Sequence, residues 1–181
     1  MSVFELIALV SGVLGVWFTI KQNIWCWPMA LVSVVISMII FYQQHLYGDS
    51  ALQVFYFLSG VYGWYFWQQR QKTEFLISRM IMAHVPLYLL ITLVQAFLYY
   101  VILKKLHSDK PLFDAILTAC SLTATYMMTK KWLENWFIWV LIDSAYVVLY
   151  LLKEMYTFAL LYAAFSAFAY YGWVTWKKTV H

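Results

Sequence analysis

Long apolar runs alternate with short polar stretches along the whole chain. Crossing the hydrocarbon core of a bilayer takes about 20 apolar residues, and seven runs approach that length: 3–20, 25–45, 51–68, 84–103, 112–129, 132–152 and 155–176. Residues 74–83 are amphipathic and are expected to lie along the membrane interface. The pattern predicts an all-α polytopic membrane protein with seven transmembrane helices.

Composition supports this prediction. Hydrophobic residues make up 65% of the chain and charged residues 11%, whereas a soluble domain carries about 25% charged residues. So few charges cannot cover a soluble surface, and the bilayer must act as the solvent. The net charge of +4 comes without a basic cluster interleaved with aromatic residues, which excludes nucleic acid as an expected partner.

The distribution of Lys and Arg predicts the orientation. With seven spans, one side of the membrane receives eight of these residues: Lys21, Arg70, Lys72, Arg79, Lys130, Lys131, Lys177 and Lys178. The other side receives four: Lys104, Lys105, Lys110 and Lys153. Because cytoplasmic loops are enriched in Lys and Arg, we expect the N-terminus outside and the C-terminus in the cytoplasm.

An internal repeat divides the chain. Residues 4–67 and 113–176, compared at a fixed offset of 109, share ten identities, and Tyr-Gly-Trp-x-x-Trp at 62–67 returns at 171–176. Each copy holds three helices, and four spans separate equivalent points, so the two copies run in the same direction through the membrane. Such parallel repeats are a design known among transporters. We therefore expect a 3+1+3 architecture of two parallel three-helix repeats, with residues 1–70 and 109–181 as the repeats and 71–108 as the interfacial loop and linker helix.

The sixth run contains the most unusual polar residue. A stripe of aromatic side chains and one acid follows steps of four and three, which places it on one helix face: Trp132, Trp136, Trp139, Asp143, Tyr146 and Tyr150. Asp143 lies about 18 Å along the helix from Lys131, at a depth where a carboxylate costs roughly 2.5–3.5 kcal/mol. Either a neighbouring hydroxyl or carbonyl satisfies a protonated Asp143, or its carboxyl group faces a substrate.

Trp136 and Trp139 also allow two interpretations. Both could pack between helices. Indole rings beside an acid would equally suit a flat cationic heterocycle, with a cation–π attraction of about 2 kcal/mol when desolvated. The stripe motivates the hypothesis that the substrate is a small organic cation.

Buried amides suggest a polar path through other helices. Gln53 opens the third run with Tyr56 on the same face, and Gln95 lies near the middle of the fourth run. Interhelical hydrogen bonding is the alternative role for each amide.

Sequence signals for catalysis are missing. The chain has no phosphate-binding Gly-rich loop with its Lys, its four His lack metal-ligand spacing, and no Ser or Cys is placed to act as a nucleophile. We expect no enzyme, no metal and no cofactor. The alternatives to a transporter are an integral membrane enzyme and a receptor for a small cationic heterocycle.

Several motifs resemble the PnuC family of vitamin transporters. They are Asn23-x-Trp25-x-Trp27-Pro28, Leu52-Gln53-x-x-Tyr56, Tyr62-Gly63-Trp64-x-x-Trp67, Leu161-Tyr162, Gly172-x-x-x-Trp176 and, most specific, Glu134-Asn135-Trp136-x-x-Trp139-x-x-x-Asp143. Together they span nearly the whole chain.

The resemblance implies a fold related to the SWEET sugar transporters, a homotrimer, and a location in the bacterial inner membrane. It implies facilitated diffusion (uniport) of nicotinamide riboside or thiamine, trapped by a separate kinase. It places Asn135, Trp136, Trp139 and Asp143 at the substrate site, with contributions from Gln53 and Tyr56. Three residues from the patterns above complete the candidate set: Tyr146, Gln95 and Trp27.

Overall fold

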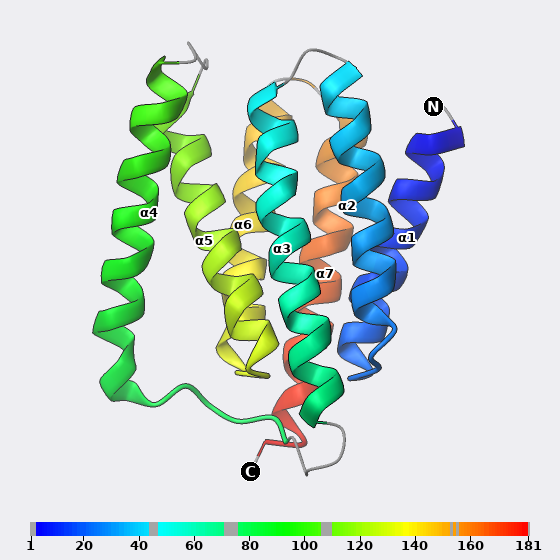
Figure 1. The fold of residues 1–181 in the computed structure, drawn as a ribbon, viewed down its shortest axis with the longest axis vertical. Helices are drawn as coiled ribbons and strands as arrows, with labels where there is room; N and C mark the ends of the chain where they lie inside the picture. Colours follow the sequence, from blue (N-terminus) through cyan, green and yellow to red (C-terminus); the bar gives the residue numbers. More distant parts are fainter. Residues whose placement is uncertain are drawn as a thin grey trace. The chain divides into compact units, whose positions relative to one another are not determined.

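The structure of the protein is a computed structural model that describes residues 3–43, 47–70, 76–105, 110–152, 154 and 156–180. These residues form seven long α-helices and one short 3-10 helix (Figure 1). The helices are α1 Val3–Ile20, α2 Cys26–Gln43, α3 Tyr47–Arg70, η1 Met82–His84, α4 Val85–Lys105, α5 Pro111–Thr129, α6 Glu134–Leu152 and α7 Tyr156–Lys177. The prediction of an all-α protein with seven long helices is confirmed, and the predicted boundaries agree to within a few residues.

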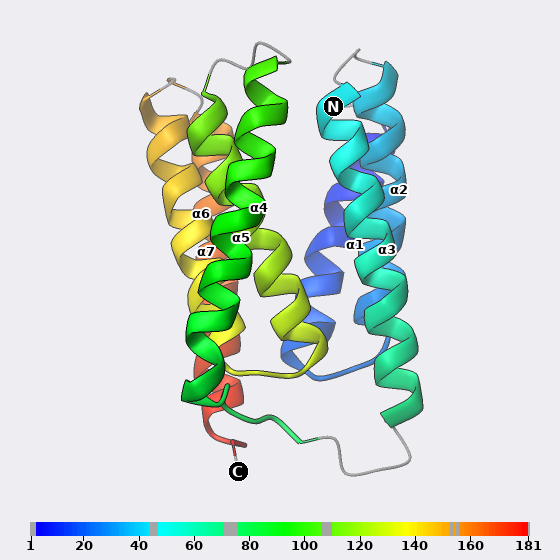
Figure 2. The ribbon, with the colours of Figure 1, turned by 60° about the vertical axis from the view of Figure 1, so that its left-hand side comes forward.

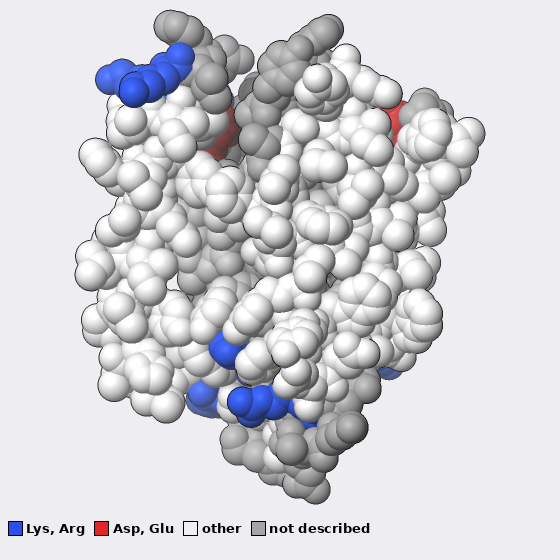
Figure 3. Space-filling view, viewed as in Figure 1, with Lys and Arg blue, Asp and Glu red and all other residues white. Residues whose placement is uncertain are grey.

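Five of the helical segments are long and apolar enough to cross a membrane: Val3–Ile20, Cys26–Gln43, Met82–Lys105, Pro111–Thr129 and Glu134–Leu152. Helices α3 and α7 fall outside this group because their apolar content includes many Tyr and Trp rings, whose polar tips lower hydropathy. The Lys and Arg side chains visible in Figure 3 lie toward the helix ends. This placement suits helices whose middle sections meet hydrocarbon.

The chain divides into two compact units, Met1–Phe75 and Leu76–His181. In the first unit, α2 packs against both α1 and α3. In the second unit, neighbours in the chain are neighbours in space: α4 packs on α5, α5 on α6 and α6 on α7 (Figure 2). The linker helix α4 therefore belongs to the same unit as α5–α7. The partition into two repeats and a separate linker stays a prediction.

The turns that follow α1 and α5 each contain a residue with left-handed backbone at the equivalent position. Gln22 has φ of 54° and Lys131, which is 109 positions later, has φ of 53°. Left-handed backbone is uncommon for residues with a side chain, so its recurrence at equivalent positions is informative. Each turn reverses the chain and delivers it to the helix that carries the buried tryptophan of its unit, Trp27 or Trp136.

A lysine that directly follows α1, and another that directly follows α5, each lie over an aromatic ring of the helix before them. Lys21 Nζ is 5.2 Å from the ring centroid of Trp17, and Lys130 Nζ is 5.5 Å from that of Tyr126. These pairs again stand 109 positions apart. An amphipathic ring with a cation one turn later is a common anchor at the membrane surface.

Of the segment expected at the interface, residues 76–81 are not helical and residues 82–83 belong to the 3-10 helix η1. We call residues 76–81 the strap. The Ser78 N–H donates to the Lys131 carbonyl at 3.2 Å, and the Leu133 N–H donates to the Ser78 carbonyl at 2.9 Å. Met80 N–H donates to Glu134 Oε2 at 2.9 Å, and Ile77 is buried. The strap thus holds the turn that leads into α6; Glu74 lies outside the described residues.

Candidate functional site

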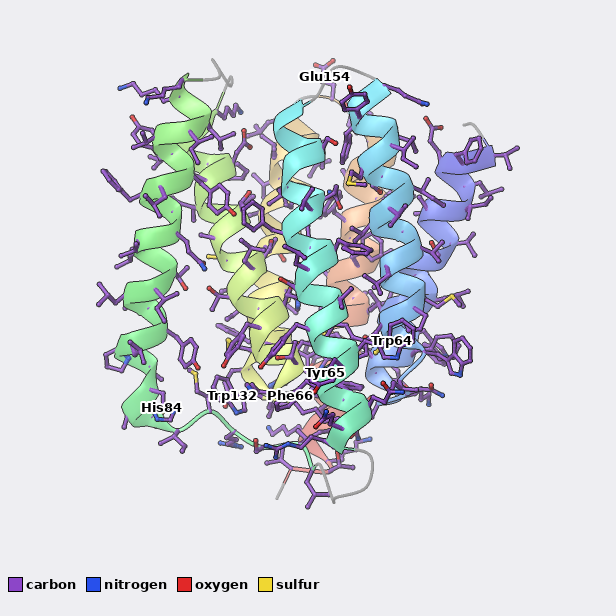
Figure 4. The ribbon with its side chains drawn as sticks, in the orientation of Figure 1. Trp64, Tyr65, Phe66, His84, Trp132 and Glu154 are labelled. Carbon is purple, nitrogen blue, oxygen red and sulfur yellow. The ribbon has the colours of Figure 1, made fainter. Side chains whose placement is uncertain are left out.

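Helix α6 carries most of the candidate site, but it begins two residues later than the sequence pattern predicted. It starts at Glu134. The expectation that Trp132 opens the helical stripe is wrong, because Trp132 lies in the preceding turn and pairs with Ser78 of the strap. Its ring stands edge-on to Tyr88, with centroids 5.3 Å apart. Figure 4 places Trp132 and His84 at the same end of the second unit, and Glu154 at the far end of α6.

Asp143 lies near the middle of α6, about 14 Å from Glu134 along the helix axis. Its side chain is 8% exposed. Within the part of the chain that the structure describes, it makes no hydrogen bond and no ion pair. A buried acid without a partner is expensive in a membrane. Neither a described hydroxyl nor a described carbonyl group supplies the hydrogen bond that a purely structural role would need.

A cluster of tyrosines continues from Asp143 toward the end of α6. The Tyr162 ring of α7 lies 4.7 Å from Tyr146 and 5.3 Å from Tyr150, measured between centroids. Tyr162 and Tyr150 also share a side-chain hydrogen bond, and Asp143 is close enough to Tyr162 to act on it electrostatically. Tyr162 was not among the predicted site residues, since spacing within one helix cannot reveal which residue of another helix meets it.

Three polar atoms of the second unit are buried without a partner among the described residues: Asn135 Oδ1 and Trp136 Nε1 in the first turn of α6, and Gln95 Oε1 near the middle of α4. Asn135 is fully buried and donates from Nδ2 to the Trp132 carbonyl at 2.6 Å. Most buried polar atoms in proteins are hydrogen-bonded, and an orphan costs about 1–3 kcal/mol. Three of the predicted site residues therefore hold unused hydrogen-bonding capacity.

The Trp136 ring is almost fully buried, and α7 packs against it. It meets Trp176 edge-on, with centroids 5.3 Å apart and planes at 87°. Gly172 lies against the ring. In the first unit Trp27 has the same arrangement: it meets Trp67 edge-on at 5.5 Å and 87°, and Gly63 lies against it.

The remaining candidates are partly exposed. Trp139 lies on α6 one turn before Asp143, and its side chain is half-buried. Gln53 and Tyr56 lie one turn apart on α3 of the first unit, and both are half-buried. Of the candidate residues, Asn135, Trp136, Trp139, Asp143 and Tyr146 lie on α6.

Metal binding finds no support in the described ranges, since they contain no group of three or more His, Cys, Asp or Glu that could hold an ion. Within α6 itself, Glu134 is the other acid, and its carboxylate is already engaged by the Met80 N–H of the strap. What α6 offers is a row of aromatic rings, an acid and an amide, which are groups that bind an organic solute.

A helix that keeps polar atoms unpaired within a membrane span is typical of proteins that carry polar solutes, and comparison with known proteins gives the same class: a membrane transporter. The chain belongs to the nicotinamide mononucleotide transporter family, whose model matches residues 2–178. Because this is a family of transporters, the enzyme alternative is set aside.

Similar proteins include the nicotinamide riboside transporter PnuC of Escherichia coli (strain K12), 28% identical over 97% of this chain and 85% of the relative. The nicotinamide riboside transporter PnuC of Neisseria mucosa is 22% identical over 96% of this chain and 72% of the relative. A crystal structure of the vitamin B3 transporter PnuC superposes with a TM-score of 0.78 and 22% identity, and the match covers 97% of this chain and 80% of that one. The resemblance to PnuC proteins is thereby confirmed.

Proposed function

We propose that this protein carries nicotinamide riboside across the bacterial inner membrane by facilitated diffusion. The relatives from Escherichia coli and Neisseria mucosa are named as nicotinamide riboside transporters. The observation that carries the proposal is Asp143, an acid that is buried in the middle of α6 with no hydrogen bond or ion pair among the described residues. A cationic pyridinium ring is the kind of ligand that such a group would attract.

The charge of the site favours the riboside over the mononucleotide. A phosphate group needs Arg, Lys or backbone N–H donors, and α6 contains neither Arg nor Lys. Helix α7 has Lys177 in its last turn as its basic residue. A phosphate beside Asp143 would meet a like charge, whereas the uncharged ribose would meet hydrogen-bonding groups.

Residues of α6, together with Gln95 of α4, form the proposed binding site. Trp139 is half-buried and stacks on the pyridinium ring, and Asp143 balances its charge. Asn135 Oδ1 and Gln95 Oε1, both orphaned, accept hydrogen bonds from ligand N–H or hydroxyl groups, and Tyr146 borders the acid. Trp136, which is more deeply buried, donates from its indole N–H.

Gln53, Tyr56 and Trp27 of the first unit stay predicted contacts from the sequence. Uptake of labelled nicotinamide riboside into liposomes, measured for one variant at a time, tests these contacts. Trp27 Nε1 is buried without a described partner, as Trp136 Nε1 is, which supports including Trp27.

The remaining parts of the proposal concern transport. Transport is uniport without a coupling ion, and a separate kinase traps the vitamin. We further propose two parallel repeats, a homotrimer, and an orientation with the N-terminus outside. The Lys and Arg count supports this orientation, and the matching turns at Gln22 and Lys131 support the repeats.

Purified protein in liposomes tests this function. Labelled nicotinamide riboside should equilibrate across the bilayer without ATP or an ion gradient. In a titration with three ligands, the riboside should bind more tightly than thiamine and than nicotinamide mononucleotide. Uptake equal to that of empty liposomes would refute the proposal, and tighter binding of thiamine would reassign the substrate.

A further inference from the structure

Gly172 stands where no larger residue fits. A Cβ atom built on Gly172 would lie 2.7 Å from Trp136 Cε2 and 2.8 Å from Cδ2. Real Cβ contacts are essentially never this short, so an alanine here would push the Trp136 ring out of place. Trp176, one turn later on α7, supports the same ring edge-on and is fully buried. We call Gly172, Trp176 and Trp136 the clasp.

The first unit contains the same clasp at positions 109 residues earlier. A Cβ atom on Gly63 would come even closer to the Trp27 ring, and Trp67 stands edge-on to Trp27 at the same interplanar angle of 87°. Two copies with different surroundings have therefore kept one glycine and two tryptophans in one geometry. If these residues only filled space between helices, the same glycine and tryptophans would not be required in both units, because volume-conserving apolar substitutions are well tolerated in packed cores.

The clasp holds the indole ring in place but gives its N–H no hydrogen-bond acceptor. Trp27 is 2% exposed and Trp136 is 3% exposed. In both rings Nε1 is buried with no hydrogen-bond partner in the part of the chain described here. An indole free to turn would bring this N–H to one of the many carbonyl oxygens of a helical protein. The packing against glycine and the second tryptophan prevents that rotation and keeps a donor unused.

We propose that Gly172 and Trp176 are positioning residues of the substrate site: they lock the Trp136 indole so that its N–H is held ready for an acceptor oxygen of the ligand. In a nucleoside such an acceptor is a ribose hydroxyl or the carboxamide oxygen. This inference rests on the proposed function of the α6 site and assigns a role to two α7 residues outside the predicted set. Because the indole N–H is already held in position, ligand binding loses no side-chain entropy in ordering it.

A double-mutant cycle on riboside binding tests the clasp. Gly172→Ala displaces the ring, and Trp136→Phe removes the N–H and the volume that causes the clash. A hydrogen bond of typical net strength corresponds to about a tenfold change in Kd. We expect each single variant to raise Kd by about tenfold and the double variant to bind no more weakly than Trp136→Phe, because no donor is then left to position.

Gly12→Ala in α1 is the matched control. Its added Cβ would lie 3.2 Å from Ser33 Oγ, a side chain that can move, so Kd should stay at the wild-type value. Thermal unfolding of each purified variant separates folding from binding. If Gly172→Ala does not fold, Trp176→Phe serves instead, with an expected rise in Kd of about threefold.

Three results would overturn the inference. One is an unchanged Kd in a folded Gly172→Ala or Trp176→Phe protein. Another is additive losses in the double variant, which would mean that glycine and tryptophan act independently. The third is wild-type protein that binds no riboside, which would overturn the proposed function together with this role; the first two leave the proposed function standing.

Discussion

Replacement of Asp143 by asparagine should change stability and binding in opposite directions. The acid is 8% exposed and has no hydrogen bond or ion pair among the described residues, so its burial is not offset within the ligand-free protein. Asparagine has nearly the same shape but carries no charge. The variant therefore removes both a cost that the folded protein bears and an attraction that a cationic ligand would use.

The expected sizes follow from burial and charge. An aspartate at the centre of a spanning helix costs roughly 2.5–3.5 kcal/mol, and we expect Asp143→Asn to recover about 1 kcal/mol, which raises Tm by about 2–4 °C. A cation about 4 Å from the carboxylate gains about 4 kcal/mol at an effective dielectric constant near 20. If desolvation offsets half of this gain, the loss of about 2 kcal/mol raises Kd roughly 30-fold.

Two measurements on the same purified protein check this prediction: thermal unfolding in detergent and a calorimetric titration with nicotinamide riboside. Glu154→Gln is the control, because Glu154 is an exposed acid in the turn after α6 and its loss should alter neither value. An Asp143→Asn protein that unfolds at a lower temperature and binds the riboside normally would show that the acid has a structural hydrogen bond, and the reasoning would fail.

Three further predictions concern the ring, the strap and the ligand charge. Trp139→Ala should raise the Kd for the riboside about tenfold through the loss of a cation–π contact. Trp64 lies on an exposed part of α3, so Trp64→Ala should leave Kd unchanged, and titration of both variants with the riboside checks this. Glu134→Ala removes the acceptor of the Met80 N–H and should speed hydrogen exchange at that amide, whereas Glu134→Gln should retain most of the protection. Uncharged nicotinamide should compete for riboside uptake at least tenfold more weakly than unlabelled riboside, and equal competition would argue against Asp143 as a charge partner.

The sequence alone determined the helices of this protein. Hydropathy acts locally, because about 20 consecutive apolar residues must either cross the bilayer or be buried. The predicted run 3–20 therefore coincides with α1 Val3–Ile20, and 112–129 nearly coincides with α5 Pro111–Thr129. The place of Asp143 near the middle of α6 also followed from counting residues along the sixth run, whereas its depth in the membrane stays a prediction.

Contacts between helices could be decided only by the tertiary structure. The identity of Trp27 and Trp136 was visible in the aligned copies, but the close approach of Gly63 and Gly172 to those rings was not. Tyr162 was not predicted as a site residue because Tyr146 and Tyr150, which its ring contacts, lie on another helix, α6.

The start of α6 was missed for a related reason. Ser78 of the strap binds the backbone around Trp132, and this distant contact holds those residues in a turn although their apolar character favours continuing the helix. A sequence period reports which residues share one helix face. It does not carry the axial offset and rotation between helices, and those determine which side chains meet, which glycines must stay small and which polar atoms are left without a partner.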